Sequence, residues 1–274
     1  MATPLSRLLE PSELEALLGR EDLVIVDLCK PELYARSHVP GALHLKGTRL
    51  MSNAPPALGQ HPSFSEVESL LGCLGINPSK HVVIYDDEGG GWAGRLAWIL
   101  DLVGLHQWSY LNGGIVAWIK ERHKTESEAN LPKSCDPMIG CDFANLSATV
   151  NADQIISQLG CTDFAVWDAR RREEYTGEIM RANRGGHIPG ATNLEWIELI
   201  DQNNNLRIKQ NAQNILDDFG LTKDKIIATH CQLHQRSSFT YMVARILGYE
   251  KITGYGGSWA EWGNLDHTPI EYGF

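Results

Sequence analysis

The sequence lacks the features that would place this protein in a membrane, on a nucleic acid or outside the cell. No apolar run approaches the roughly 20 residues that span a bilayer. Acidic residues outnumber basic ones by 34 to 24, and a formal net charge of −10 disfavours nucleic acids and anionic lipid surfaces as partners. Residues 1–7 show no basic region followed by an apolar core, so no secretory signal is predicted. We therefore expect a cytoplasmic protein that binds neither membranes nor nucleic acids.

Cysteine is also scarce, at six residues in 274. This number and its scatter suit reduced thiols in a cytosol better than a disulfide framework. The one closely spaced pair, Cys135 and Cys141, has no second pair to complete the four ligands of a zinc site. We therefore predict no metal site, and we interpret both residues as linker thiols. Cys29, directly after a predicted strand, is interpreted as structural.

What the sequence does contain is one unit repeated twice. The apolar strand pattern of Leu23–Asp27 returns at Phe164–Asp168, and the turn His38-Val-Pro-Gly-Ala returns at His187-Ile-Pro-Gly-Ala. Each copy alternates predicted strands with predicted helices, which indicates an α/β unit with a mainly parallel sheet. The predicted fold class is therefore α/β, with two tandem domains whose sheets are flanked by helices.

The repeat also predicts the domain bounds. We expect one domain over residues 1–122, a linker over 123–147 and a second domain over 148–274. The linker is polar and contains Pro132 and Pro137, which is typical of a surface connection. The second copy is eight residues longer between its strand and its turn, and we place this insertion within residues 176–186.

The most informative stretch surrounds Cys231. Ile226–Ala228 is a short apolar run typical of a buried parallel strand, and from Ser237 apolar residues recur at helical spacing until Gly248. Cys231 therefore follows a strand and precedes a helix N-terminus, where backbone N–H groups and the helix dipole favour a thiolate. Arg236 adds a positive charge. A lone Cys is commonly buried and inert, but this setting predicts a nucleophile.

The first copy lacks this nucleophile. At a constant offset of 144 residues, Cys231 corresponds to Asp87 and Arg236 to Trp92. Residues 86–88 are all acidic where an anion would have to bind, so we predict that the first domain is catalytically silent. The same loop matches G-x-G-x-x-G over Gly89–Gly94, a pattern of dinucleotide sites. The acidic residues would repel a pyrophosphate, and no acidic ribose ligand follows, so no cofactor is predicted.

Two motifs carry a family resemblance. Cys231-x-x-x-x-Arg236-Ser237 resembles the active-site loop of bacterial members of the rhodanese (sulfurtransferase) family, and Gly256-Gly-Ser-Trp-x-x-Trp262 resembles their closing motif. The resemblance extends over nearly the whole chain. It implies a bacterial tandem-domain rhodanese whose silent first domain packs against the second and helps to wall the active-site cleft.

The resemblance further implies a thiosulfate:cyanide sulfurtransferase. Cys231 would take the outer sulfur of thiosulfate, or of a related donor, as a persulfide and pass it to cyanide or a thiol, including a protein Cys. Arg236 would bind the anionic end of the donor. The backbone N–H groups of the loop would cradle the sulfur at Gln232, Leu233, His234 and Gln235. We expect a monomer that needs no metal or cofactor.

Two departures from the family's patterns bear on the donor. The loop begins Cys231-Gln-Leu, whereas animal thiosulfate sulfurtransferases have Cys-Arg-Lys, so side chains should hold thiosulfate less strongly here. Glu174 stands where animal mercaptopyruvate sulfurtransferases have an Arg that binds the substrate carboxylate. We therefore expect 3-mercaptopyruvate to be the poorer donor.

Other functions and roles stay open at this point. Cys231 could serve a sulfur carrier that docks to a partner. A Cys-dependent phosphatase is a further alternative, although only four residues separate Cys231 from Arg236, one fewer than the phosphatase signature has. The resemblance implies that Asp168 and Arg170 brace the domain near the site; the alternative is an ordinary ion pair or a solvated basic cluster with Arg171 and Arg172. His187 is interpreted as structural and His230 as strand-end packing, and His234 either tunes the site or lies at the surface.

Overall fold

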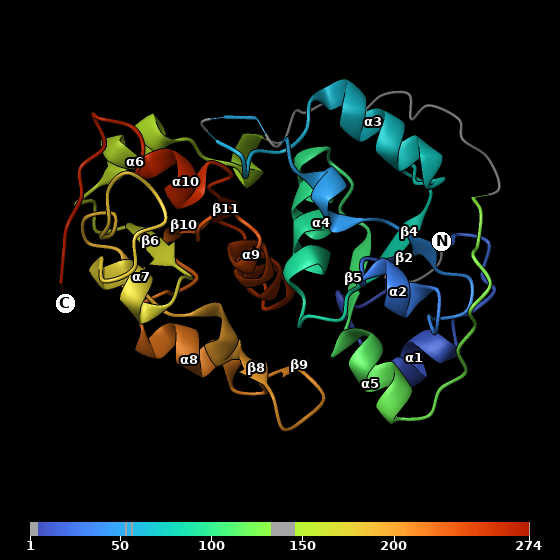
Figure 1. The fold of residues 1–274 in the computed structure, drawn as a ribbon. Helices are drawn as coiled ribbons and strands as arrows, with labels where there is room; N and C mark the ends of the chain where they lie inside the picture. Colours follow the sequence, from blue (N-terminus) through green and yellow to red (C-terminus); the bar gives the residue numbers. More distant parts are fainter. Residues whose placement is uncertain (1–4, 53, 56, 133–145, 274) are drawn as a thin grey trace. The chain divides into compact units, whose positions relative to one another are not determined.

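The computed structural model describes residues 5–52, 54–55, 57–132 and 146–273 (Figure 1). The chain divides into two compact units. Unit 1 comprises Met1–Leu50, Pro62–Asn145 and Ile200–Ile208, and unit 2 comprises Met51–His61, Leu146–Leu199 and Lys209–Phe274. Each unit thus takes most of one repeat and a short segment of the other, a division that the repeat pattern did not predict. Part of the predicted linker, residues 133–145, lies outside the described residues. Cys135 and Cys141 lie within that part.

Unit 1 is built on a parallel sheet of five strands in the order β1-β5-β4-β2-β3. Its strands are β1 (Leu8–Leu9), β2 (Leu23–Asp27), β3 (Leu43–His44), β4 (His81–Tyr85) and β5 (Trp108–Leu111). Its helices are α1 (Pro11–Glu15), α2 (Pro31–Tyr34), η1 (Gly47–Leu50), α3 (Phe64–Cys73), α4 (Gly91–Leu102) and α5 (Gly114–Lys120). The unit also contains a hairpin in which β8 (Ile200–Asp201) and β9 (Arg207–Ile208) pair antiparallel.

Unit 2 repeats the design with a parallel sheet in the order β11-β10-β6-β7. Its strands are β6 (Phe164–Asp168), β7 (Thr192–Asn193), β10 (Ile226–His230) and β11 (Ile252–Gly254). Its helices are η2 (Leu146–Ala148), α6 (Ala152–Gln158), α7 (Arg172–Thr176), η3 (Trp196–Leu199), α8 (Ala212–Asp218), α9 (Arg236–Ile246) and α10 (Ser258–Trp262). The predicted α/β class with two mainly parallel sheets is confirmed.

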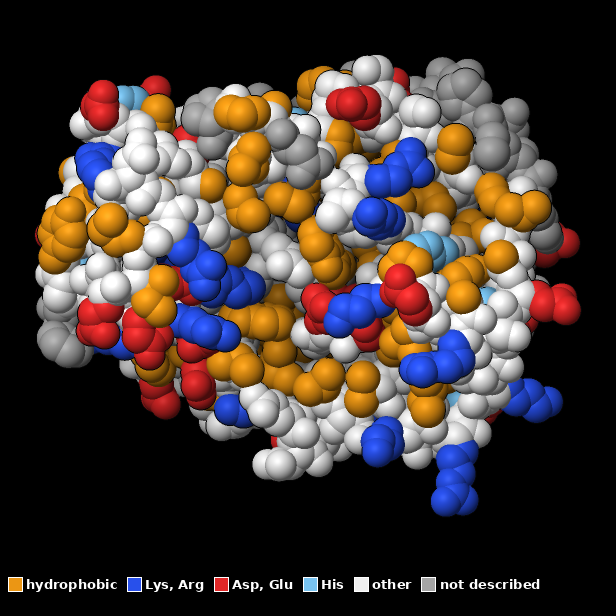
Figure 2. Space-filling model, in the orientation of Figure 1, with side chains coloured by type: hydrophobic (Ala, Val, Ile, Leu, Met, Phe, Trp, Pro, Cys, Tyr) orange, Lys and Arg blue, Asp and Glu red, His pale blue; other side chains and the backbone are white. Residues whose placement is uncertain are grey.

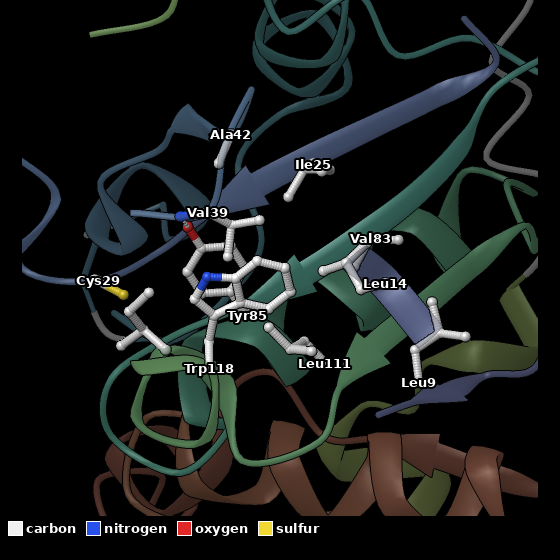
Figure 3. Close-up of a cluster of buried hydrophobic side chains, with 11 residues drawn as sticks. Leu9, Leu14, Ile25, Cys29, Val39, Ala42, Val83, Tyr85, Leu111 and Trp118 are labelled. Carbon is white, nitrogen blue, oxygen red and sulfur yellow. Dashed lines mark hydrogen bonds between the residues drawn. The ribbon is translucent and has the colours of Figure 1, made fainter. Parts of the chain in front are cut away.

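Each sheet is held by a buried apolar cluster. In unit 1 the rings of Tyr85 and Trp118 lie within a cluster that reaches from Leu9 to Leu111 (Figure 3). The Tyr85 hydroxyl accepts a hydrogen bond of 3.1 Å from the backbone N–H of Val39. In unit 2 the cluster contains Trp259 and Trp262 of the closing motif, the preceding Tyr255, and Val166. The core of unit 2 therefore anchors the segment that follows β11.

The two His-x-Pro-Gly turns have the same geometry in both units. His38 stacks on Tyr34 and His187 on Tyr175, with ring centroids 3.9 and 3.7 Å apart. Each imidazole Nδ1 also contacts the carbonyl oxygen of its tyrosine. Because the contact recurs in both copies, it serves the fold rather than one site.

The surface carries both signs of charge, which lie interspersed over the face shown in Figure 2. None of the helices within the described residues is long and apolar enough to cross a membrane.

Candidate active site

Cys231 lies at the carboxyl end of β10, between this strand and α9. β10 pairs in parallel with β6 on one side and with β11 on the other, so it is a central strand of the sheet. The carboxyl ends of parallel strands are the usual location of sites in α/β folds. The Cys231 side chain is 1% exposed. The predicted strand–loop–helix arrangement around Cys231 is thus the one the structure contains.

The surroundings of the sulfur favour the thiolate. Burial by itself raises the pKa of a thiol, because it removes water from the charged form. Here the positive charge of Arg236, the Ser237 hydroxyl and the backbone N–H groups of Ser237 and Leu233 outweigh burial, and the pKa of Cys231 is lowered. In unit 1, by contrast, burial and the nearby Asp27 raise the pKa of Cys29. The two buried thiols therefore differ in reactivity, with Cys231 the nucleophilic one.

The closing motif fixes the backbone of the loop. The Cys231 N–H donates to Ser258 Oγ at 3.3 Å, and the Cys231 carbonyl accepts from the Trp259 N–H at 2.9 Å. The Ala260 N–H donates to the Gln232 carbonyl at 3.0 Å. Ser258 adopts φ +51°, a left-handed conformation that few residues other than glycine take up. The start of α10 therefore holds the loop at three points.

A segment of the first repeat also contacts the loop, and no sequence pattern predicted this contact. Residues 51–61 belong to unit 2. A Cβ atom added to Gly59 would come within 2.6 Å of the Leu233 carbonyl oxygen and 2.7 Å of the Gly256 carbonyl oxygen. Only a residue without a side chain can approach the loop so closely.

Arg236 is engaged by a carboxylate that comes from α7. Its two terminal nitrogens donate to the two oxygens of Glu174 at 2.6 and 3.0 Å, a bidentate pair. Glu174 is 1% exposed, and it also forms an ion pair with Arg181, with Nε 3.1 Å from Oε1. Burial alone would raise the pKa of Glu174, but Arg236 and Arg181 lower it, and the pKa of Arg236 is raised. Arg236, which was predicted to bind the donor, is therefore already paired with the carboxylate of Glu174.

The inserted segment contacts the loop beside this pair. The Gln232 side-chain amide donates to the Arg181 carbonyl at 3.1 Å. Further along, Arg184 binds the carbonyls of Trp262 and Thr268, each at 3.0 Å. The insertion is thus anchored to the end of α10, and it positions Arg181, whose side chain is 52% exposed, next to Glu174.

Asp168 and Arg170 form a buried brace, not a solvated pair. Their side chains are 0% and 1% exposed, and Arg170 donates to both Asp168 oxygens and to the Gly186 carbonyl. The Arg170 guanidinium lies 4.2 Å from the centre of the Trp259 ring. His230 Nε2 lies 3.5 Å from Asp168, and burial lowers the pKa of His230 to about 4, so this imidazole is neutral at pH 7.

The four loop residues between Cys231 and Arg236 differ in burial. His234 is fully buried, so the surface alternative is wrong, and its Nδ1 lies 2.7 Å from Ser237 Oγ. Gln232 and Leu233 are half-buried, and Gln235 precedes the first residue of α9. The structure thus brings Cys231, Arg236 and His234 together around one loop. The sequence placed Glu174 at a substrate-binding position but did not predict its pairing with Arg236, and Arg181 is an additional residue beside them.

The equivalent loop of unit 1 is filled by its own carboxylate. Asp86 Oδ1 accepts the N–H groups of Glu88 and Gly90 at 3.0 and 2.8 Å, and Oδ2 accepts those of Trp92 and Ala93 at 2.9 and 3.0 Å. Ala93 corresponds to Ser237, whose N–H faces the Cys231 sulfur in unit 2. The N–H group at this position therefore faces the sulfur in unit 2 and binds an internal carboxylate in unit 1.

We predict that Asp86→Ala lowers the free energy of unfolding of unit 1 by about 3–5 kcal/mol, because it leaves four N–H groups without their acceptor, three of them on buried or half-buried residues. Asp87→Ala is the matched control, since the Asp87 carboxylate is half-buried and caps none of these four groups. Urea unfolding of both variants measures the difference. Equal losses would contradict the role assigned to Asp86.

We predict strong energetic coupling between Glu174 and Arg236. Arg236→Ala removes the bidentate partner of a buried carboxylate and should cost about 2–4 kcal/mol of stability, whereas Glu174→Ala/Arg236→Ala should recover part of that loss. The exposed pair Arg20 and Asp22 provides the control cycle, for which we expect much weaker coupling. Additive losses at Glu174 and Arg236 would show that the pair is not coupled.

Comparison with known proteins supports the division of the chain into two repeated domains. The sequence model described as "Rhodanese-like domain" matches twice, at residues 10–121 and 151–265. The chain is similar to proteins named "Thiosulfate sulfurtransferase" from Azotobacter vinelandii and Pseudomonas aeruginosa, at 44% and 45% identity over 96% of each chain. It is 29% identical to "Sulfur carrier protein TtuD" of Thermus thermophilus over 88% of this chain and 87% of that one.

Solved structures share the fold at lower identity. "Crystal structure of YnjE" superposes with a TM-score of 0.88 at 21% identity, covering 98% of this chain and 68% of that one. "The structure of EanB/Y353A complex with ergothioneine" gives the same TM-score and identity, covering 98% and 70%.

Proposed function

Because the chain belongs to the rhodanese family, we propose that it is a thiosulfate sulfurtransferase that works through a persulfide on Cys231. The observation that carries this proposal is the lowered pKa of a buried thiol that faces backbone N–H groups and Arg236. Such a site favours the thiolate, the nucleophilic form of the side chain, through its own charges and N–H groups.

The reaction has two steps. In the first, the Cys231 thiolate attacks the outer sulfur of thiosulfate; an S–S bond forms, the bond to the sulfonate sulfur breaks, and sulfite leaves with the electron pair. In the second, cyanide or a thiolate attacks the terminal sulfur of the persulfide. Thiocyanate or a new persulfide departs, and the Cys231 thiolate is regenerated. This is covalent catalysis with ping-pong order.

The N–H groups of the loop stabilise the anion in both steps. The backbone N–H groups of Leu233 and Ser237 face the thiolate, and they are fixed in place before the reaction begins. The anionic end of the donor binds Arg236, which it must share with Glu174, and Arg181 offers a second, more exposed guanidinium beside them.

The first domain has no catalytic role in this proposal, because Asp86 occupies its cradle. We place the protein in the cytoplasm as a monomer. This location is supported by the cysteines of the described residues, Cys29, Cys73, Cys161 and Cys231, which are all free thiols. A carrier role is the second candidate, supported by the similarity to a named sulfur carrier protein, and Cys231 would carry the persulfide in that role as well.

We predict that Cys231→Ser abolishes sulfur transfer from thiosulfate to cyanide, while Cys29→Ser, Cys73→Ser and Cys161→Ser each keep most of it. The reason is that the Cys231 thiol has the lowered pKa and the loop N–H groups. Mass spectrometry of the wild type after thiosulfate treatment should show the mass of one added sulfur, removable by cyanide. Turnover by Cys231→Ser would rule out the mechanism, and loading without turnover would favour the carrier.

The same preparation distinguishes sulfur from phosphate chemistry. A phosphoryl group has three equatorial oxygens to cradle, and this loop has one residue fewer than the phosphatase signature. We therefore expect negligible hydrolysis of an aryl phosphate. Efficient phosphatase turnover without sulfur transfer would overturn the proposed function.

We predict that Glu174→Gln lowers the KM for thiosulfate several-fold and improves use of 3-mercaptopyruvate, because it removes the anion that competes with the donor for Arg236 and Arg181. The effect should shrink as salt is added. Glu198→Gln, an exposed carboxylate on η3, is the control and should change neither value. An unchanged or higher KM in Glu174→Gln would show that Glu174 does not compete with the donor.

A further inference from the structure

A buried chain of polar groups leads from the nucleophile back into the loop. His234 Nδ1 lies 2.7 Å from Ser237 Oγ, and both side chains are fully buried. The Ser237 hydroxyl in turn is one of the groups that lower the pKa of Cys231, as a hydrogen-bond partner of its sulfur. The three side chains thus form one connected path, Cys231 to Ser237 to His234, inside unit 2.

The backbone is shaped to place the imidazole at this point. His234 adopts φ +52°, in the left-handed region that residues other than glycine seldom occupy. Its carbonyl oxygen accepts a hydrogen bond from the Ser238 hydroxyl, which ties this conformation to the first turn of α9. The strained residue is therefore the one whose side chain reaches Ser237.

Counting hydrogens fixes the direction of the chain. A serine hydroxyl has one hydrogen to donate, and its oxygen can accept others. A thiolate can only accept, so the Ser237 hydrogen goes to the sulfur. The short contact between Ser237 Oγ and His234 then requires the hydrogen on imidazole Nδ1, because two acceptors would repel each other. The geometry thus assigns the Nδ1–H tautomer to His234.

We propose that His234 is a positioning residue that donates Nδ1–H to Ser237 Oγ and so keeps the Ser237 hydroxyl directed at the Cys231 sulfur. The proposal deepens the proposed function and rests on it in one respect, namely that Cys231 reacts as a thiolate. Without His234, the Ser237 hydroxyl is free to turn to another acceptor. The thiolate would then lose one of the hydrogen bonds that stabilise it.

The other charged groups near the sulfur keep their charge while Cys231 is titrated. Arg236 on α9 has a raised pKa, and Asp168 on β6 and Glu174 on α7 have lowered ones. His230 on β10 has its pKa lowered to about 4 and stays neutral above pH 6. The remaining charged groups near Arg236 and Glu174 are Arg170, Arg181 and Glu195. A pH change seen between pH 6 and 9 therefore reports on Cys231 rather than on these groups.

Three variants test the proposal. His234→Asn keeps a hydrogen donor on its side-chain amide nitrogen, in the place of Nδ1, and Asn tolerates the left-handed conformation. His234→Ala and Ser237→Ala both remove the hydrogen bond to sulfur. A thiolate that loses a hydrogen bond has a higher pKa, so the acid limb of kcat/KM for thiosulfate should move to higher pH. We expect about a tenfold loss at pH 6 for both Ala variants, the effect of one pKa unit.

Two comparisons of kcat/KM distinguish a positioning role of His234 from a purely structural one: rescue by His234→Asn, and non-additivity of the two Ala substitutions. His234→Asn should stay within about threefold of the wild type at pH 6, since it restores the donor. His234→Ala/Ser237→Ala should be no worse than Ser237→Ala alone, because His234 acts through Ser237. If His234→Asn behaves like His234→Ala, or if the two Ala substitutions are additive, the proposal is wrong.

A direct titration makes the result independent of turnover. The thiolate absorbs in the ultraviolet, and subtracting the spectrum of the matched Cys231→Ser protein isolates Cys231 from the exposed Cys73 and Cys161. We expect the midpoint of this titration to rise in both Ala variants and to stay in place in His234→Asn. An unshifted midpoint in Ser237→Ala overturns the proposal even if His234→Ala fails to fold. A shifted midpoint without any thiosulfate turnover in the wild type would uphold it and reject the proposed function instead.

Discussion

The site depends on keeping a buried sulfur negatively charged. Cys231 is 1% exposed, and such burial alone favours the neutral thiol. The protein offsets it with one guanidinium, one hydroxyl and two backbone N–H groups that converge on the sulfur. These groups come from five consecutive loop and helix positions, 233–237, so the path of the backbone from β10 into α9 is the decisive feature. The closing motif holds this path through Ser258 and Trp259.

The charge that favours the thiolate is itself balanced. Arg236 pairs with the buried Glu174, and Glu174 is shared with the half-exposed Arg181. Without an anion partner, a guanidinium that is 20% exposed would carry a larger desolvation cost. With Glu174 as its anionic partner, Arg236 lies in a site that is close to electrically neutral before a donor binds. Under the proposed function, a donor that binds Arg236 would compete with the carboxylate of Glu174.

The duplicated fold shows two ways to satisfy N–H groups of equivalent loops, which share the position of Ser237 and Ala93. In unit 2 a sulfur anion and the donor or persulfide would occupy the loop during the reaction. In unit 1 the carboxylate of Asp86 occupies the loop permanently, through four hydrogen bonds. Asp86 precedes the position that corresponds to Cys231, so the loss of the nucleophile and the filling of its cradle lie at two adjacent residues. Buried donors need an acceptor, and a domain without a substrate supplies its own.

The sequence alone determined the fold class, the strands β2, β6 and β10, the position of Cys231 before a helix and the absence of a nucleophile at Asp87, because these follow from local periodicity and from the repeat. It could not determine that Glu174 binds Arg236 across 62 positions, that Gly59 contacts the loop from the other repeat, or that His234 is buried. The pairing and the contact join residues far apart in the chain, and the direction of the His234 side chain follows from a left-handed backbone conformation that its neighbours in sequence do not predict. Local sequence patterns fix where a loop begins and ends, whereas the partners of its side chains are decided when the sheet brings distant segments together.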